Sequence, residues 1–227
     1  MFSALAPAFR SVPLRAAIAG FALLVAGAGL AACSSTTIAV KEAFGISKRE
    51  QLVARVEDAR DQQNEAKEQF ASALDEFLAV TGSGGTELEA RYRKLTKAFE
   101  ASESQAKAVS ARIRDVEAVS AKLFGEWERE LEEYTSDSLR ASSQAQLDET
   151  RTQYTKLVGV MRGAESKMQP VLAAFRDQVL FLKHNLNAQA ISSLGNTAGQ
   201  IESDVTRLIA EMEASIDEAD SFIRQMG

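Results

Sequence analysis

Apolar residues recur at alternating steps of four and three along most of this 227-residue chain. Steps of this size place side chains on one face of an α-helix, and no segment alternates with the period of two that a β-strand requires. The pattern runs in four series: Leu52 to Val80, Leu88 to Trp127, Leu147 to Leu186 and Ile191 to Met226. The sequence therefore predicts an all-α fold built from heptad-patterned helices.

Turn and capping residues separate the four series. Ser47 with Glu50, and Thr86 with Glu89, have the spacing of capping boxes, in which two side chains satisfy free amides at a helix N-terminus. A glycine-rich break follows the first series, Asp137 is the expected N-cap of the third helix, and two asparagines mark the last bend. We expect four helices, near residues 47–80, 86–132, 138–186 and 188–226.

The width of the apolar stripe distinguishes a bundle from a two-stranded coil. Ile209, Ile216 and Ile223 form a second row beside the last series, which favours an elongated antiparallel four-helix coiled-coil bundle over residues 47–227. The two middle helices are longer than the outer two, so we expect them to project as a two-helix tip near residues 120–150. Pro170 lies inside the third series, where we favour a kink over a break, because the series continues in register.

The N-terminal segment has the features of a lipoprotein signal. Residues 1–32 contain two arginines and no acid, and about 15 consecutive apolar or glycine residues precede the segment Leu30-Ala31-Ala32-Cys33. This segment is typical of a lipobox, in which the cysteine, the only one in the chain, carries the acyl chains. A plain signal peptide or an uncleaved anchor helix with an incidental cysteine is the alternative. Residues 33–46 would then form a lipidated tether.

Charge and export narrow the range of partners. Removal of residues 1–32 leaves 24 basic and 32 acidic residues, a formal net charge of −8. An acidic chain is a poor ligand for nucleic acid and for anionic lipid faces, so we expect anchoring through acyl chains on Cys33. Ser34 after the cysteine favours the inner leaflet of the outer membrane, facing the periplasm, in a Gram-negative host. Formation of a homo-oligomer stays open.

The sequence contains no recognisable catalytic, metal-binding or nucleotide-binding motif. His184 is the only histidine, too few for a di-iron bundle site, and we interpret it as a surface residue near a helix end. Gly159 and Gly163 lack the Gly-Lys-Ser/Thr ending of a phosphate-binding loop. We therefore expect no enzymatic activity, no cofactor and no metal. Among the polar residues within the apolar series, Glu165 is expected to face Lys107 in a structural ion pair.

The expected tip combines acidic and aromatic residues. Residues 123–139 carry six acids and one arginine together with Phe124, Trp127 and Tyr134. In one interpretation these aromatic side chains fill the narrow end of the coil. In the other, they anchor a protein partner while the acids repel anionic lipid. Phe124, Trp127 and Tyr134 are therefore the candidate partner-binding residues.

Two stretches resemble an uncharacterised family of bacterial helical lipoproteins catalogued as a domain of unknown function. They are KREQLVARVEDARDQQNEAKEQFASALDEF, from Lys48 to Phe77, and LKHNLNAQAIS, from Leu182 to Ser192. The resemblance implies an all-helical exported protein and assigns no functional residue. We expect a lipid-anchored envelope protein that acts as a helical scaffold or spacer and contacts an unknown envelope protein. The alternative is a periplasmic protein that holds an apolar or amphipathic ligand between its helices.

Overall fold

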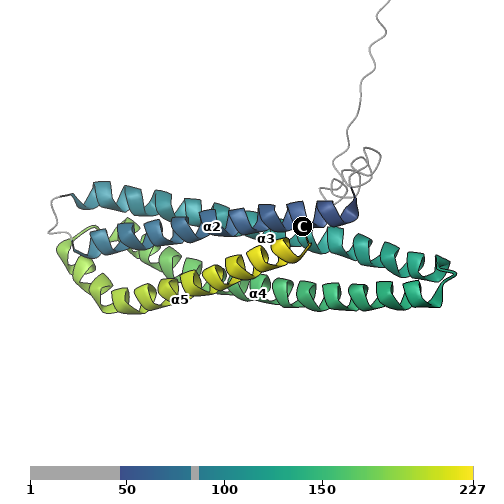
Figure 1. Ribbon diagram of the computed structural model, residues 1–227. Coiled ribbons are helices and arrows are strands. Elements are labelled where there is room, and N and C mark those ends of the chain that lie inside the picture. Colours follow the sequence, from purple (N-terminus) through teal and green to yellow (C-terminus); the bar gives the residue numbers. More distant parts are fainter. Residues whose placement is uncertain (1–46, 83–86, 227) are drawn as a thin grey trace, which may run out of the picture. The chain divides into compact units, whose positions relative to one another are not determined.

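The computed structural model describes residues 47–82 and 87–226, which lie within one compact unit of the chain. The predicted signal segment, the tether and Cys33 lie outside the described residues. Four α-helices account for nearly all of the described part, and no strand occurs there (Figure 1). They are α2 (Lys48–Thr81), α3 (Leu88–Glu133), α4 (Asp137–His184) and α5 (Ala188–Met226).

The helices form an antiparallel four-helix bundle, as the heptad pattern predicts. Each helix contacts its neighbour in the cyclic order α2, α3, α4, α5, while the diagonal pairs make no close backbone approach within the described residues. Ion pairs join residues from the start of one helix to residues from the end of the next: Lys48 to Glu126, and Arg60 to Asp220. Such pairs require neighbouring helices to run in opposite directions.

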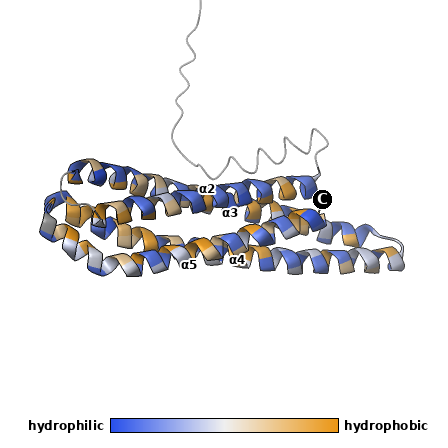
Figure 2. Ribbon diagram, turned by 60° about the vertical axis from the view of Figure 1, so that its left-hand side comes forward, coloured by the Kyte–Doolittle hydropathy of each residue, from blue (hydrophilic) through white to orange (hydrophobic). Residues whose placement is uncertain are grey.

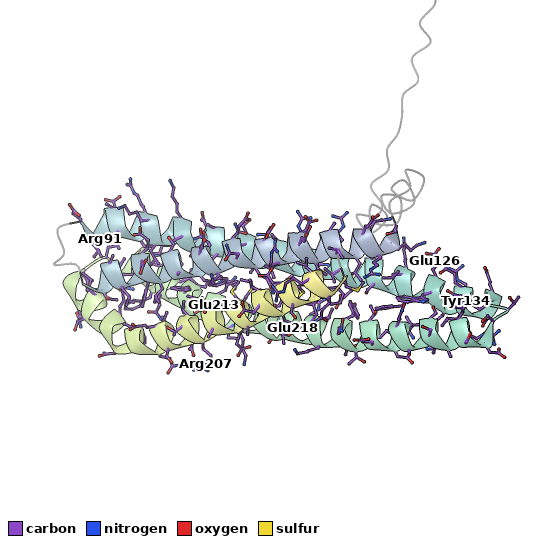
Figure 3. All side chains as sticks on the ribbon, viewed as in Figure 1. Arg91, Glu126, Tyr134, Arg207, Glu213 and Glu218 are labelled. Atoms are coloured by element: carbon purple, nitrogen blue, oxygen red, sulfur yellow. The ribbon has the colours of Figure 1, made fainter. Side chains whose placement is uncertain are left out.

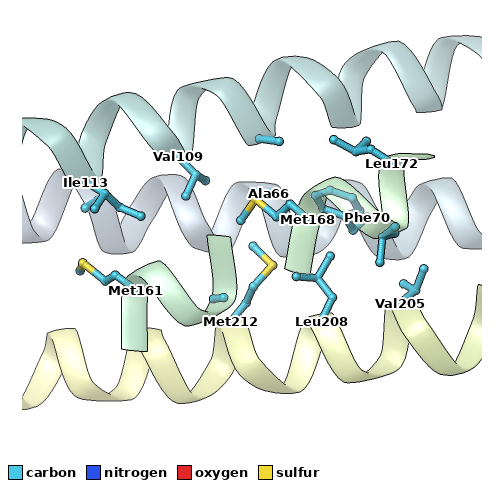
Figure 4. Packing of buried hydrophobic residues seen from close by; sticks show 14 of the residues in the cluster. Ala66, Phe70, Val109, Ile113, Met161, Met168, Leu172, Val205, Leu208 and Met212 are labelled. Carbon is cyan, nitrogen blue, oxygen red and sulfur yellow. The ribbon is translucent and has the colours of Figure 1, made fainter. Parts of the chain in front are cut away.

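The core consists of the residues that the heptad pattern places inside. Hydrophobic residues recur along the sides of the helices that face one another (Figure 2). Phe77 of α2 and Phe175 of α4 meet edge to face, with ring centroids 6.0 Å apart, so side chains of the diagonal pair touch across the centre. Figure 4 shows Met161, Met168 and Met212 among the buried side chains, where flexible thioethers fill irregular space.

Polar residues within the apolar series take two different positions. Gln63 and Ser215 are fully buried, and the Ser215 hydroxyl donates a 2.8 Å hydrogen bond to Oε1 of Gln63. Ser102 donates to the carbonyl of Ala98 one turn earlier in its own helix, which satisfies a buried hydroxyl locally. Two other exceptions, Arg151 and Glu165, lie at the margin of the core and form ion pairs.

The helix ends confirm one predicted cap and correct another. Ser47 and Glu50 form both hydrogen bonds of a capping box. Thr86, the predicted cap of α3, lies outside the described residues, and that helix begins at Leu88 after Glu87, whose side chain makes no capping hydrogen bond. The N-cap of α4 is Ser136, not Asp137: Ser136 keeps an extended backbone and its hydroxyl accepts from the amide of Leu139. Asp137 instead opens the first turn, where a negative charge is favourable.

Helix α4 continues through Pro170 without a break, as the continuous register of the third series predicted. It ends at His184, two residues before the predicted end, and α5 follows almost at once. The side chain of Asn187 accepts a 2.9 Å hydrogen bond from the amide of Ala190 and thereby caps α5. None of the described helices combines the length and the apolar character that crossing a bilayer demands.

Two helices project beyond the other two. At the end of the bundle where α2 begins and α5 ends, Arg49 donates a 2.9 Å hydrogen bond from Nε to the carbonyl of Met226. Beyond this point α3 and α4 continue as a hairpin that turns at residues 134–136 (Figure 1). Residues 126–150, which include this hairpin, are called the extension below. The predicted two-helix tip is therefore present.

Candidate functional site

The extension carries most of the excess negative charge of the chain. Residues 126–150 include eight acidic and two basic residues, a net charge of −6. Three of these acids form ion pairs, and one of them, Glu128, pairs with Arg151 at 2.7 Å. Glu130, Glu132 and Glu133 are exposed and make no ion pair within the described part of the chain. These three carboxylates leave the α3 side of the extension strongly negative.

Phe124, a predicted partner-binding residue, contributes to the core at the base of the extension. Its side chain is buried and meets the ring of Tyr154 edge to face at a centroid distance of 5.3 Å. The guanidinium of Arg151 lies over the same ring, 5.2 Å from the centroid. Burial raises the pKa of the Tyr154 hydroxyl, although a hydrogen bond with Ser120 opposes that effect. Phe124 therefore stabilises the junction and offers a partner little surface.

Trp127 and Tyr134 keep more exposed surface. Trp127 is half-buried, and its indole N–H donates a 2.8 Å hydrogen bond to Oγ of Ser143, which links α3 to α4 across the hairpin. Tyr134 is the C-cap residue of α3 and lies near the far end of the extension, whereas Glu126 lies near its base (Figure 3). Arg140 donates a 2.6 Å hydrogen bond to the carbonyl of Tyr134 and so closes the turn. The three predicted aromatic residues are thus spread along the extension.

A groove lies at the point where α2 begins and α5 ends. It has a volume of about 530 Å³ and is called the step groove below. Every helix of the bundle contributes to its lining, which consists of Arg49, Trp127, Gln146, Glu149, Thr150, Gln153, Gln225 and Met226. Trp127 is the only one of these residues that sequence reasoning identified. The unequal helix lengths predicted the projecting tip, but they did not show which side chains of α4 and α5 would meet there.

A second groove of about 670 Å³ lies along the extension itself. Its lining is Glu128, Leu131, Glu132, Arg140 and Gln144. Leu131 is buried between the two helices, while the surrounding side chains are charged or amidic. The extension therefore presents polar grooves next to partly exposed aromatic rings, an arrangement suited to contact with another protein.

The predicted ion pair between Glu165 and Lys107 was wrong. Glu165 pairs with Arg162, whose Nε also donates a 3.0 Å hydrogen bond to Glu117 across the α3–α4 interface. The hydrogen bonds that Arg162 donates to the carboxylates of Glu117 and Glu165 raise its pKa, although burial opposes them. Long side chains lean toward the N-terminus of their own helix. The charged end of a long side chain therefore lies level with backbone positions nearer the N-terminus of its own helix. Between two antiparallel helices, the residues whose charged ends meet have higher numbers on both helices than the alignment of the backbones indicates.

Burial has the largest single effect on Glu165 and raises the pKa of its carboxyl group. Hydrogen bonds from Ser110 and Arg162, together with the positive charges of Arg162 and Arg114, outweigh burial, so the pKa of Glu165 is lowered. The cluster stabilises the interface between α3 and α4 and contacts no groove described above.

The described residues contain no group of three side chains that would suit a metal ion. His184 is exposed at the end of α4. The lipobox residues Leu30, Ala31 and Ala32, like Cys33, lie outside the described residues. The chemistry that the described part offers is therefore charge, hydrogen bonding and aromatic contact, concentrated at the extension and the step groove.

Comparison with known proteins places the chain in a family. No curated protein matches the sequence. A family model described as a protein of unknown function (DUF2959) matches residues 38–226, which cover all four helices. The chain belongs to this family of unknown function.

Proposed function

We propose that this protein is a lipid-anchored scaffold of the cell envelope that acts by contact, with the extension as its docking element. The observation that carries the proposal is the continuation of α3 and α4 beyond the ends of α2 and α5. Projection separates the docking surface from the rest of the bundle, and the buried core below it supplies a rigid support. The lipobox pattern at Cys33 supports anchoring, and the negative charge of the extension disfavours contact with anionic lipid.

Acylation of Cys33 is tested directly. Mass spectrometry of the protein purified from its native membrane is expected to show an N-terminal cysteine that carries acyl chains. Replacement of Cys33 by Ser is expected to release the protein from the membrane fraction or to leave the precursor uncleaved. Recovery of wild-type protein that is full-length, unacylated and cytosolic would refute the anchoring part of the proposal.

Docking through the extension is tested by photo-crosslinking in living cells. Leu139 on the extension and Leu180 near the other end of α4 are both exposed leucines, at 59% and 52%, so they form a matched pair of sites. A photoreactive phenylalanine analogue at position 139 is expected to give a discrete adduct with another envelope protein that the same analogue at position 180 does not give. Adducts that are identical from both positions, or absent from position 139, would contradict the proposal.

Trp127→Ala tests whether the aromatic surface of the extension takes part in docking. The Trp127 indole links the two helices through Ser143, so circular dichroism must first show that helix content is retained. With the fold intact, we expect the adduct from position 139 to weaken severalfold, because aromatic side chains contribute much of the binding energy at interfaces. An unchanged yield of this adduct would show that Trp127 does not belong to the docking surface.

A further inference from the structure

The step groove lies beside Gln225 and Met226, the last described residues of α5. Along the body of the bundle, α4 buries Leu157 and Met161 at its interface with α5. The same face continues toward the extension through Gln146, Thr150 and Gln153, at steps of three and four residues, and these side chains line the groove. Among the described residues, of which Met226 is the last, no helix packs on this part of α4.

The shape of this surface suits a helix. Two antiparallel helices present a shallow groove between their ridges, and a third helix packs into such a groove at an interaxial distance of about 8–10 Å. Within the bundle, α2 packs on α3 and α5 packs on α4. Trp127 and Met226 are the apolar residues in the lining of the step groove, and the amides of Gln146 and Gln153 supply hydrogen-bonding groups.

The net charge of the extension favours a positively charged helix as the partner. The extension has a net charge of −6, and residues 33–227 together have −8, so most of the excess acid lies on these 25 residues. The lining of the step groove contains one acid, Glu149, and one base, Arg49, whereas Glu130, Glu132 and Glu133 lie exposed on α3 outside that lining. A second copy of this chain would bring like charges together, which is unfavourable, whereas lysine and arginine side chains would be attracted.

We propose that the step groove and the acidic face of the extension bind a basic amphipathic helix of a partner protein. The inference rests on the proposed docking function and specifies the chemistry of the partner. The apolar face of the incoming helix would contact Trp127 and Met226, and its lysine or arginine side chains would reach the carboxylates of α3 and Glu149.

The probe is a synthetic helical peptide of about 18 residues in which leucines share one face and lysines cover the other. The first reference peptide carries glutamate in place of every lysine, and the second keeps the composition but scatters the leucines. Trp127 is the only tryptophan of the chain and lines the step groove, so its emission reports occupancy at the site itself. We expect the basic amphipathic peptide to change that emission saturably, and neither reference peptide to do so at the same concentrations.

Two pairs of variants separate site-specific binding from general attraction to an acidic protein. The first variant neutralises the three exposed acids of α3: Glu130→Gln, Glu132→Gln and Glu133→Gln together. Its affinity for the basic peptide is expected to be at least about fivefold lower than that of wild type in low salt. The matched control neutralises three exposed acids elsewhere on the bundle: Glu68→Gln, Glu100→Gln and Glu202→Gln. Its affinity is expected to stay within about twofold of wild type.

The second pair tests the groove itself. Gln153→Arg places a positive charge in the groove, while the new side chain can still pair with Glu149, to which Gln153 donates a hydrogen bond. Gln200→Arg is the control, because Gln200 donates to Asp204 in the same way on a surface away from the groove. Peptide affinity is expected to fall severalfold for Gln153→Arg and to stay unchanged for Gln200→Arg.

The inference is overturned if the acidic peptide binds as well as the basic one, if both triple variants weaken binding equally, or if Gln153→Arg has no effect. It is also overturned if sedimentation shows that the chain dimerises through the extension and that the α3 triple variant strengthens the dimer. These failures differ from failure of the docking function. An adduct from position 139 that persists without peptide binding keeps the docking function and refutes only the basic helix.

Discussion

The buried pair of Gln63 and Ser215 gives a sharp test of how polar groups are accommodated in this core. Both side chains have no exposed surface, and Oε1 of Gln63 accepts its hydrogen bond from Ser215 at 2.8 Å. The Nε2 group of Gln63 is buried and has no hydrogen-bond partner among the described residues. One half of the glutamine amide is therefore satisfied and the other half is desolvated without compensation.

The free-energy changes follow from this asymmetry. Ser215→Ala leaves both polar atoms of the Gln63 amide unpaired, which costs about 1–3 kcal/mol of unfolding free energy. Gln63→Leu removes the unsatisfied group and adds apolar contact at similar volume, while the Ser215 hydroxyl can bond to a carbonyl of its own helix. We expect this variant to gain about 1–2 kcal/mol, and the double variant, which has neither polar side chain, to be at least as stable as wild type.

Thermal unfolding followed by circular dichroism measures these differences. For a domain of this length, about 1 kcal/mol shifts the Tm by roughly 2–4 °C. Ser215→Ala is therefore expected to lower the Tm by about 2–12 °C, and Gln63→Leu to raise it by about 2–8 °C. If Ser215→Ala has the same Tm as wild type and Gln63→Leu has a lower Tm, this account of the buried pair is refuted. Near-ultraviolet circular dichroism of the double variant shows whether the helices keep one register without the polar pair.

Phe175→Ala, which empties a fully buried position, is expected to cost about 3–5 kcal/mol in urea denaturation, and a cost under about 1 kcal/mol would contradict the packing. Gly159→Ala adds a methyl group where nothing lies within 4 Å, so unfolding experiments are expected to show a gain of about 0.5–1 kcal/mol from helix propensity. Because Ser110 and Arg162 help to lower the pKa of Glu165, this carboxylate stabilises the fold above its unfolded-state pKa. That contribution is lost as the pH falls through the lower folded-state pKa. Glu165→Gln is therefore expected to lose less stability than wild type between about pH 5 and 3, and identical pH profiles would exclude the contribution.

Local signals predicted the helices and several of their ends because the forces involved act within a few residues. The spacing of Ser47 and Glu50 was sufficient to predict a cap that both side chains complete. The same reasoning failed at Asp137, because Ser136 beside it offers an equally good capping group and the turn geometry decides between them. Trp127 was recognised as part of the tip, but its neighbours in the step groove were not, because they come from three other helices.

The heptad spacing and the turn residues between its series determined the all-α class, the number of helices in the bundle and the existence of the extension, since periodicity and helix length are properties of the linear chain. Tertiary structure decided which polar residues of the apolar series are buried and which form ion pairs at the margin of the core. Gln63 is enclosed because Ser215 of α5 packs against it, whereas Glu165 lies at the margin because Arg162 and Glu117 meet there. A heptad position specifies which face a residue occupies. The lean of side chains and the packing of neighbouring helices determine which residue it contacts.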